Sequence, residues 1–363
     1  MRRLQNVLVT GGCGFIGSNF IHYLLNQPDF EGQIINLDKL TYAGNPENLK
    51  DIEEQYGNQR YIFIKGDICD FELVKGIFQT YDIDTVVHFA AESHVDRSIL
   101  GPTPFIQTNI NGTFSLLEVA RYAWLEGKKE GCLFYHISTD EVYGSLGKTG
   151  LFTEDTPYRP NSPYSASKAA SDHLVRAYFK TYGLPVIISN CTNNYGPYQF
   201  PEKLIPLTIL NALEGKPIPV YGKGENIRDW IYVEDHCEAI WCLLKRGKTG
   251  EQYNIGGTNE MRNIDVVRLI CNLLDEMLGP LSFGPRENLI TFVKDRPGHD
   301  FRYAMDITKI KTTIGWMPKT NLKEGLKKTI TWYLTHRSWV EHIKSGEYQR
   351  WVKEFYGGFK DAV

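Results

Sequence analysis

Two short runs in this sequence hold side chains that can move protons. The first is Thr139–Glu141, in which Asp140 and Glu141 are adjacent, and the second is Tyr164-x-x-x-Lys168. A tyrosine beside a lysine can take a proton from a hydroxyl group. Two neighbouring carboxyls in a dry cleft do not both ionise easily, so one can act as an acid and the other as a base. These groups could carry out an oxidation followed by an elimination; alternatively, the two carboxylates only cap the turn that follows.

The spacing Tyr-x-x-x-Lys occurs three times, at Tyr61–Lys65, Tyr164–Lys168 and Tyr356–Lys360. The first lies in a strand pattern, where the two side chains are far apart, and the third lies in a glycine-broken tail. Only the second opens a predicted helix, after a serine cap and a proline. Residues four apart are neighbours on a helix, so Lys168 can lower the pKa of Tyr164; bringing that pKa from ~10 to neutrality corresponds to roughly 4 kcal/mol. The alternative is a tyrosine and a lysine on an exposed helix face.

A glycine-rich loop connects the first predicted strand, 7–10, to a helical pattern. Its spacings, Gly12-x-Gly14-x-x-Gly17 and Gly11-x-x-Gly14-x-x-Gly17, fit the dinucleotide-binding fingerprint and a known variant of it. Such glycines let backbone N–H groups approach a pyrophosphate at a helix N-terminus. The residues expected to touch the cofactor in this loop are Gly11, Gly14, Phe15, Ile16 and Gly17.

Asp38 follows the second predicted strand, 34–37. A carboxylate at this position binds the ribose 2′-hydroxyl and repels a 2′-phosphate, which favours NAD over NADP. Lys39 leaves NADP open, because a neighbouring cation could accommodate the phosphate. The alternative is an aspartate that only caps the strand.

Further strands are predicted at 61–64, 85–89 and 133–138. Ligands of an open α/β sheet bind beyond the carboxyl ends of its strands. The residues expected to border adenine and ribose are therefore Asp67, Ile68, Ala90 and Ala91. His88 is expected in the core, whereas Ser93 and His94 could either face a substrate or be ordinary polar loop residues. The predicted fold is α/β, a doubly wound parallel Rossmann sheet with a smaller C-terminal α/β substrate domain.

The composition argues against nucleic-acid binding, a metal site and membrane association. The chain has 363 residues and a formal net charge of −3, which argues against nucleic acid as the main partner. Its seven cysteines lack metal-site spacing and indicate reduced thiols in a cytoplasmic protein without a metal site. We find neither a signal peptide nor an apolar run of membrane-spanning length, so no membrane association is expected.

Longer motifs give the chain a resemblance to the dTDP-glucose 4,6-dehydratases of the extended short-chain dehydrogenase/reductase family. The resemblance covers most of the chain, and its most specific part is the Thr-Asp-Glu triplet at 139–141. The similar segments are 10–18, 37–45, 88–98, 138–144, 164–172, 193–206, 228–236 and 295–300. Two positions depart from the common pattern, Asn190 and Phe301, where arginine is frequent.

The resemblance implies a reaction. Tyr164 would take the proton of the sugar 4-hydroxyl while hydride leaves C4 for NAD, supported by Lys168 and Thr139. Glu141 would then remove the C5 proton and Asp140 would protonate the leaving 6-hydroxyl. The hydride would return to C6, giving dTDP-4-keto-6-deoxyglucose from dTDP-glucose without net use of NAD.

The resemblance also implies binding residues and an organisation. Further cofactor contacts would come from Thr41, Thr108, Asn194, Tyr164, Lys168 and Lys39. The substrate would be bound by Ser93, Thr139, Asn193, Lys203, Leu204, Pro219, Tyr221, Arg228, Asn263, Arg296 and His299. The expected domains are an NAD-binding domain at 1–190 to which 228–257 returns, a nucleotide-sugar-binding domain at 191–227 and 258–345, and a tail at 346–363. A homodimer is expected through the helices around 105–124 and 164–181.

Three alternatives stay open at this point. One is a dehydratase for another nucleotide sugar, and another is a 4-epimerase or decarboxylase of the same fold, against which the Asp140–Glu141 pair argues. The last is a non-catalytic NAD-binding module, which should have lost a catalytic residue; Thr139, Tyr164 and Lys168 are all present.

Overall fold

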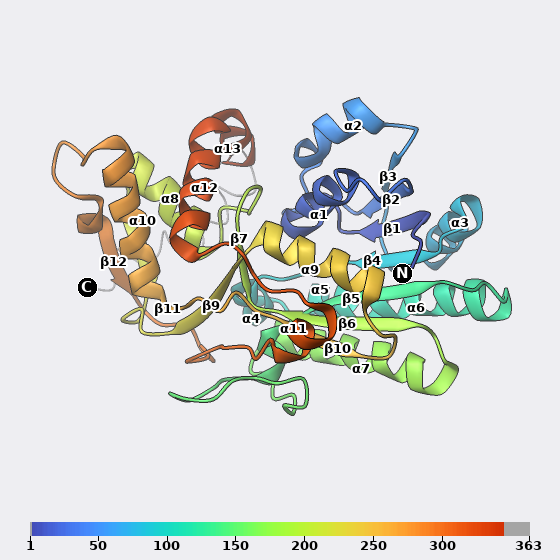
Figure 1. Cartoon of the computed structure of the whole chain (residues 1–363). Helices are drawn as coiled ribbons and strands as arrows, with labels where there is room; N and C mark the ends of the chain where they lie inside the picture. Colours follow the sequence, from blue (N-terminus) through green and yellow to red (C-terminus); the bar gives the residue numbers. More distant parts are fainter. Residues whose placement is uncertain (1, 345–363) are drawn as a thin grey trace.

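A computed structural model describes residues 2–344 of the chain. Its centre is a seven-stranded sheet in which all neighbours are parallel, in the order β10-β6-β5-β4-β1-β2-β3 (Figure 1). The strands are β1 (Asn6–Thr10), β2 (Gln33–Asp38), β3 (Tyr61–Lys65), β4 (Thr85–His88), β5 (Leu133–Thr139), β6 (Val186–Cys191) and β10 (Gln252–Ile255). The predicted doubly wound parallel sheet is confirmed.

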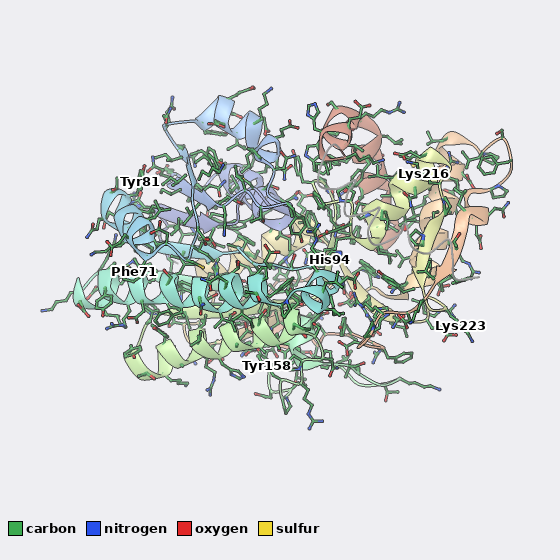
Figure 2. The ribbon with its side chains drawn as sticks, turned by 180° about the vertical axis from the view of Figure 1, so that it is seen from behind. Phe71, Tyr81, His94, Tyr158, Lys216 and Lys223 are labelled. Carbon is green, nitrogen blue, oxygen red and sulfur yellow. The ribbon has the colours of Figure 1, made fainter. Side chains whose placement is uncertain are left out.

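Helices cover both faces of this sheet because its strands are apolar on both sides. In β1, Val7 and Val9 pack toward one face and Leu8 toward the other, as the two-residue period of a strand requires. The first face is covered by α1 (Phe15–Leu25), α2 (Lys50–Tyr56), α9 (Val233–Arg246) and α11 (Thr308–Ile314). The second is covered by α3 (Phe71–Tyr81), α6 (Thr113–Ala120), η3 (Arg121–Glu126) and α7 (Pro163–Tyr182). Figure 2 shows α6 and α7 side by side on this second face.

Short elements complete the large lobe. They are η1 (Pro46–Leu49), α4 (Val95–Leu100), α5 (Thr103–Phe105), η2 (Ile106–Gly112) and η4 (Asp140–Tyr143). The segments η2 and η3 are wide, π-type turns before and after α6. Such turns often occur at functional sites.

A smaller lobe lies beside the carboxyl ends of the central strands (Figure 1). It contains a three-stranded sheet, β11-β9-β7, and a parallel pair, β12-β8. Its strands are β7 (Asn193–Tyr195), β8 (Ile218–Tyr221), β9 (Ile227–Tyr232), β11 (Glu260–Arg262) and β12 (Ile290–Val293). Its helices are α8 (Leu204–Glu214), α10 (Asn263–Leu278), η5 (Arg286–Leu289), α12 (Leu322–Thr335) and α13 (Arg337–Lys344). A separate apolar core joins α8, α10 and α12.

The chain passes between the two lobes several times. After β9 it returns through α9, which packs with α1, and β10, which pairs with β6. Strand β9 itself pairs with β7 and β11 in the smaller lobe, although its residues fall in the 228–257 segment expected to return to the large lobe. The predicted domain boundaries stay a prediction, and the predicted tail at 346–363 lies outside the described residues. Within the described residues, no helix is long and apolar enough to cross a membrane.

Candidate active site

The candidate site is a cavity of about 310 Å³ at the carboxyl ends of the central strands. The parallel strands bring their last residues to one sheet edge, where ligands of this fold class bind. The predicted cofactor residues that line the cavity are Gly11, Gly14, Phe15, Ile16, Gly17, Asp38, Lys39, Thr41, Asp67, Ile68, Ala90, Ala91, Thr108, Tyr164, Lys168 and Asn194. The structure thus brings every residue of the predicted cofactor set to one cavity.

The glycine loop leaves no room for larger side chains. Gly11 has φ +71°, and a Cβ added there would lie 2.7 Å from the Cα of Ala90. A Cβ on Gly17 would lie 2.4 Å from the carbonyl oxygen of Gly11. Gly14 precedes α1, and no side chain among the described residues caps this helix. The first-turn N–H groups of α1 therefore fit a pyrophosphate, which a helix N-terminus binds favourably.

The Asp38 carboxylate is fixed by two backbone groups. Its Oδ2 accepts from Cys13 N at 2.9 Å and its Oδ1 from Leu40 N at 2.8 Å. Burial raises its pKa above the ordinary value, and these two bonds oppose that rise. Lys39, whose charge could have received a phosphate, instead pairs with Asp67 at 2.7 Å. This arrangement fits a ribose 2′-hydroxyl better than a phosphate.

Helix α7 carries the predicted Tyr164 and Lys168, both buried. It begins with a capping box between Ser162 and Ser165, which fixes the start of its first turn. The Lys168 Nζ donates to the Ile137 carbonyl at 2.8 Å. Burial lowers the pKa of Lys168, and the negative charge of Asp172 opposes that shift.

The pKa of Tyr164 is raised well above its ordinary value by burial, and the charge of Glu141 adds to the rise. The expectation that Lys168 lowers this pKa stays a prediction for the complex with a positively charged nicotinamide ring. Such a ring would add a second cation next to the phenol and favour its ionised form.

The predicted acid–base pair lies where β5 ends. Thr139, and not a carboxylate, caps η4, because its Oγ1 accepts from Glu141 N at 3.3 Å. Burial and the charge of Glu141 raise the pKa of Asp140 well above its ordinary value. Burial also raises the pKa of Glu141, but three cations oppose that rise: Arg296, Lys203 and Arg228. The surroundings therefore favour Asp140 as the proton donor and Glu141 as the base.

The predicted substrate residues divide into two groups. Ser93, Thr139, Asn193 and Lys203 line the cavity. The others do not line it and lie in or next to the smaller lobe: Leu204, Pro219, Tyr221, Arg228, Asn263, Arg296 and His299.

Several members of the second group come together around Asp96. The Tyr221 hydroxyl donates to Asp96 Oδ2 at 3.1 Å, and Arg296 Nη1 lies 3.6 Å from Asp96 Oδ1. The ring of His299 lies edge-on to Tyr221, with centroids 6.2 Å apart. The Asn263 Oδ1 is buried without a hydrogen-bond partner among the described residues. Aromatic, amide and guanidinium groups of this kind fit a base and a diphosphate.

The cavity is also lined by residues that the sequence analysis did not identify, namely the polar residues Glu92, Gln199 and Glu202 and the aromatic residue Phe200. Glu202 is buried, accepts from the Tyr42 hydroxyl at 3.0 Å and lies 3.4 Å from Arg97 Nε. His94 lies 3.7 Å from the same carboxylate, between the two lobes (Figure 2). Glu92 and Glu202 lie within segments 88–98 and 193–206, which carry the family resemblance. Their position beside the predicted residues Ser93 and Lys203 was the sequence signal that could have identified them.

Comparison with known proteins identifies the family. A family model described as GDP-mannose 4,6 dehydratase matches residues 8–329. The dTDP-glucose 4,6-dehydratase of Salmonella typhimurium is 56% identical to this chain, over 98% of the chain and 99% of the relative. The chain belongs to the dTDP-glucose 4,6-dehydratase family.

Solved structures of this dehydratase family agree. The Bacillus anthracis dTDP-glucose 4,6-dehydratase in complex with NAD has a TM-score of 0.82 and 48% identity, and the match covers 94% of this chain and 100% of that one. The Streptomyces venezuelae dTDP-glucose 4,6-dehydratase, also with NAD bound, has a TM-score of 0.83 and 44% identity. This match covers 94% of this chain and 100% of that one. The similarity therefore extends over both lobes.

Proposed function

We propose that this protein dehydrates dTDP-glucose to dTDP-4-keto-6-deoxyglucose, with NAD as a hydride carrier that is regenerated in each turnover. The observation that carries this proposal is the Asp140–Glu141 pair in the same cavity as Tyr164, Lys168 and the glycine loop. A dehydrogenase needs only the tyrosine, the lysine and a hydroxyl group. An adjacent acid and base are what an elimination of water adds.

The residues would divide the reaction as follows. When bound, NAD supplies an acceptor for the hydride of C4 and a donor of that hydride to C6. Tyr164 accepts the proton of the 4-hydroxyl, with Lys168 stabilising the phenolate. The ketone at C4 makes the C5 proton acidic, and Glu141 removes it. Asp140 gives its proton to the 6-hydroxyl, which leaves as water.

The NAD-binding residues would be those of the glycine loop and the adjacent strand ends. The α1 N-terminus would hold the pyrophosphate, and Asp38 would bind the ribose hydroxyls of the adenosine. The two-lobed arrangement supports a division in which the smaller lobe binds the nucleotide diphosphate of the sugar. Arg228 and Arg296 would neutralise that diphosphate, and both already act on the pKa of Glu141.

The test is incubation with dTDP-glucose in D₂O, followed by NMR and mass analysis. We expect dTDP-4-keto-6-deoxyglucose with solvent deuterium at C5 and no net NADH. Unchanged dTDP-glucose from folded, NAD-loaded protein would refute the assigned substrate, and UDP-, GDP- and CDP-sugars would then be compared. A C4 epimer formed without loss of water would refute the role of the carboxylate pair.

We also propose that the protein is a homodimer. Large apolar side chains are exposed on the helices of one face: Leu100, Ile106, Phe114, Tyr122 and Tyr182. Exposed large apolar side chains on neighbouring helices support a protein interface. Light scattering at micromolar concentration should give a dimer that Leu100→Glu weakens, whereas Phe292→Glu, at an exposed site in the other lobe, should not. A monomeric mass for the unmodified chain would contradict this proposal.

A cytoplasmic location is proposed as well. All seven cysteines are free, and burial raises the pKa of Cys13 and Cys191 to about 12. Thiols without disulfide partners fit a reducing compartment. Fractionation of cells that produce the protein should place it with cytoplasmic marker enzymes.

A further inference from the structure

The last described helix, α13, contributes to the core of the smaller lobe and also contacts the large lobe. Its Trp339 and Val340 are buried in the apolar core that joins α8, α10 and α12. The Trp339 Nε1 donates to Asn48 Oδ1, in η1 of the large lobe, at 2.7 Å. The exposed fractions of Trp339 and Asn48 are 6% and 1%. A hydrogen bond shielded from water therefore joins the two lobes on the side where α13 faces α1 and α2 (Figure 1).

Asn48 connects this hydrogen bond to the glycine loop. Its Nδ2 donates to the Cys13 carbonyl oxygen at 3.0 Å, and the backbone N–H of Asn45, the cap of η1, donates to the same oxygen at 2.9 Å. The Cys13 N–H in turn donates to the Asp38 carboxylate at 2.9 Å. A continuous series of hydrogen bonds thus runs from Trp339 through Asn48 and Cys13 to the residue expected to bind the ribose.

The backbone between β2 and η1 forms one wall of the cavity. Four of its residues line that cavity: Lys39, Thr41, Ala43 and Gly44. Leu40 has φ +56°, a left-handed conformation that is unusual for a bulky residue. Such a conformation persists only where the surrounding contacts hold it. The segment 39–49 therefore depends on contacts at its far end, and η1 provides them.

A second contact joins α13 to η1 but is open to solvent. His342 Nδ1 lies 2.9 Å from Glu47 Oε1, and these side chains are 65% and 43% exposed. Exposed ion pairs contribute little to stability. A buried amide that loses its hydrogen-bond partner, in contrast, is clearly destabilised. Of the two contacts, the one that Trp339 makes should therefore hold the segment in place.

We propose that Trp339 is a positioning residue for NAD, which acts through Asn48 to keep the segment 39–49 and the glycine loop closed on the bound cofactor. This inference rests on the proposed function, in which NAD is regenerated in each turnover and does not need to leave the site. The segment must move before the cofactor can leave, and that movement breaks the bond between Trp339 and Asn48. Loss of this bond should therefore accelerate the release of NAD and leave the chemical steps unchanged.

The experiment measures how fast the loaded protein releases NAD. Radiolabelled NAD is bound, an excess of unlabelled NAD is added, and the retained label is followed by rapid gel filtration. Trp339→Phe keeps an aromatic ring in the core but removes the N–H donor, so that Asn48 Oδ1 loses its partner. We expect release about tenfold faster than from the unmodified protein, the value of one buried hydrogen bond whose partner is left unpaired. With dTDP-glucose and saturating NAD, product formation per site should be unchanged.

Trp316→Phe is the matched control. Trp316 is also buried, lies outside the cavity lining, and its Nε1 has no hydrogen-bond partner among the described residues. The same substitution there removes no hydrogen bond, and NAD should be released at the unmodified rate. Unchanged release from Trp339→Phe, or an equal acceleration by Trp316→Phe, would overturn the proposal.

Asn48→Ser tests the same bond from its other side and replaces Trp339→Phe if the latter does not fold. It should also accelerate release. Because both residues act through one bond, the double variant should release NAD no faster than Asn48→Ser alone, and additive effects would overturn the proposal. Absence of product from unmodified protein that retains its labelled NAD would instead refute the proposed function, since the release measurement requires no turnover.

Discussion

Replacement of Glu141 by glutamine should separate the oxidation from the elimination. The amide keeps the size and shape of the side chain but cannot accept the C5 proton. Tyr164 and Lys168 remain, so C4 should still be oxidised. The variant should therefore stop with the hydride on the cofactor and with water still attached to C6.

The size of the effect follows from what Glu141 contributes. Loss of a general base costs about 10² to 10⁴ in rate, or about 3–5 kcal/mol in the barrier to elimination. Removing its negative charge also takes away one cause of the high pKa of Asp140, so the acid becomes less firmly protonated. Arg228 and Arg296 keep their places, and substrate binding should change little. Stability should not fall, because a neutral amide avoids the burial cost of a carboxylate.

The assay is stopped-flow absorbance of bound NADH, with product measured in parallel. Glu141→Gln should accumulate bound NADH while product forms about 10² to 10⁴ times more slowly than in the unmodified protein. Glu154→Gln, at a half-buried carboxylate outside the cavity lining, is the matched control and should behave normally. Product formation by Glu141→Gln at the unmodified rate would refute the assigned role. Absence of bound NADH from a folded variant would refute the separation of the two steps.

Three further perturbations test other parts of the site. Asp67→Asn removes the ion-pair partner of Lys39 and should improve the affinity for NADP relative to NAD by up to about fivefold, the value of a partly exposed ion pair. A fluorescence titration with both cofactors measures this, and an unchanged ratio of the two affinities would contradict it. Asp172→Asn should lower the pKa of Lys168 and move the alkaline limb of the oxidation rate to lower pH, whereas Tyr158→Phe, which removes one donor to the same carboxylate, should leave the limb in place. Burial raises the pKa of Asp229 from 3.8 to about 6. Protonated Asp229 therefore adds to the free energy of unfolding; this contribution is fully present below pH 3.8 and is lost as the pH rises through 6. Asp229→Asn should flatten this part of the curve in denaturant titrations from pH 4 to 7, and an unchanged slope would show that Asp229 is not its origin.

The elements around the cofactor could be predicted because their signals are local. The predicted strand 34–37 lies within β2, and the glycine loop lies between the predicted strand 7–10 and the helix that follows it. Alternation and glycine spacing are properties of neighbouring residues. The fold class followed from the order of these patterns and is confirmed.

Contacts between distant segments could not be read from such patterns. The cations that act on Glu141 come from positions 203, 228 and 296, and only folding brings them together. The partner of Lys168 is a backbone carbonyl, which has no sequence signature. Likewise, the pairing of Lys39 with Asp67 decides what Lys39 can bind, although each residue alone was compatible with NADP.

The repeated passage of the chain between the lobes has a consequence for how the molecule can come apart. The chain leaves the large lobe after β6, returns with α9 and β10, leaves again at β11, and comes back once more with α11, which packs on β10. No single cut separates the two bodies, so neither can be produced by simple truncation or exchanged as a module between relatives. A cut after β6, for example, would remove α9, β10 and α11 from the large lobe together with the whole smaller lobe, and the described chain should therefore unfold in one cooperative transition.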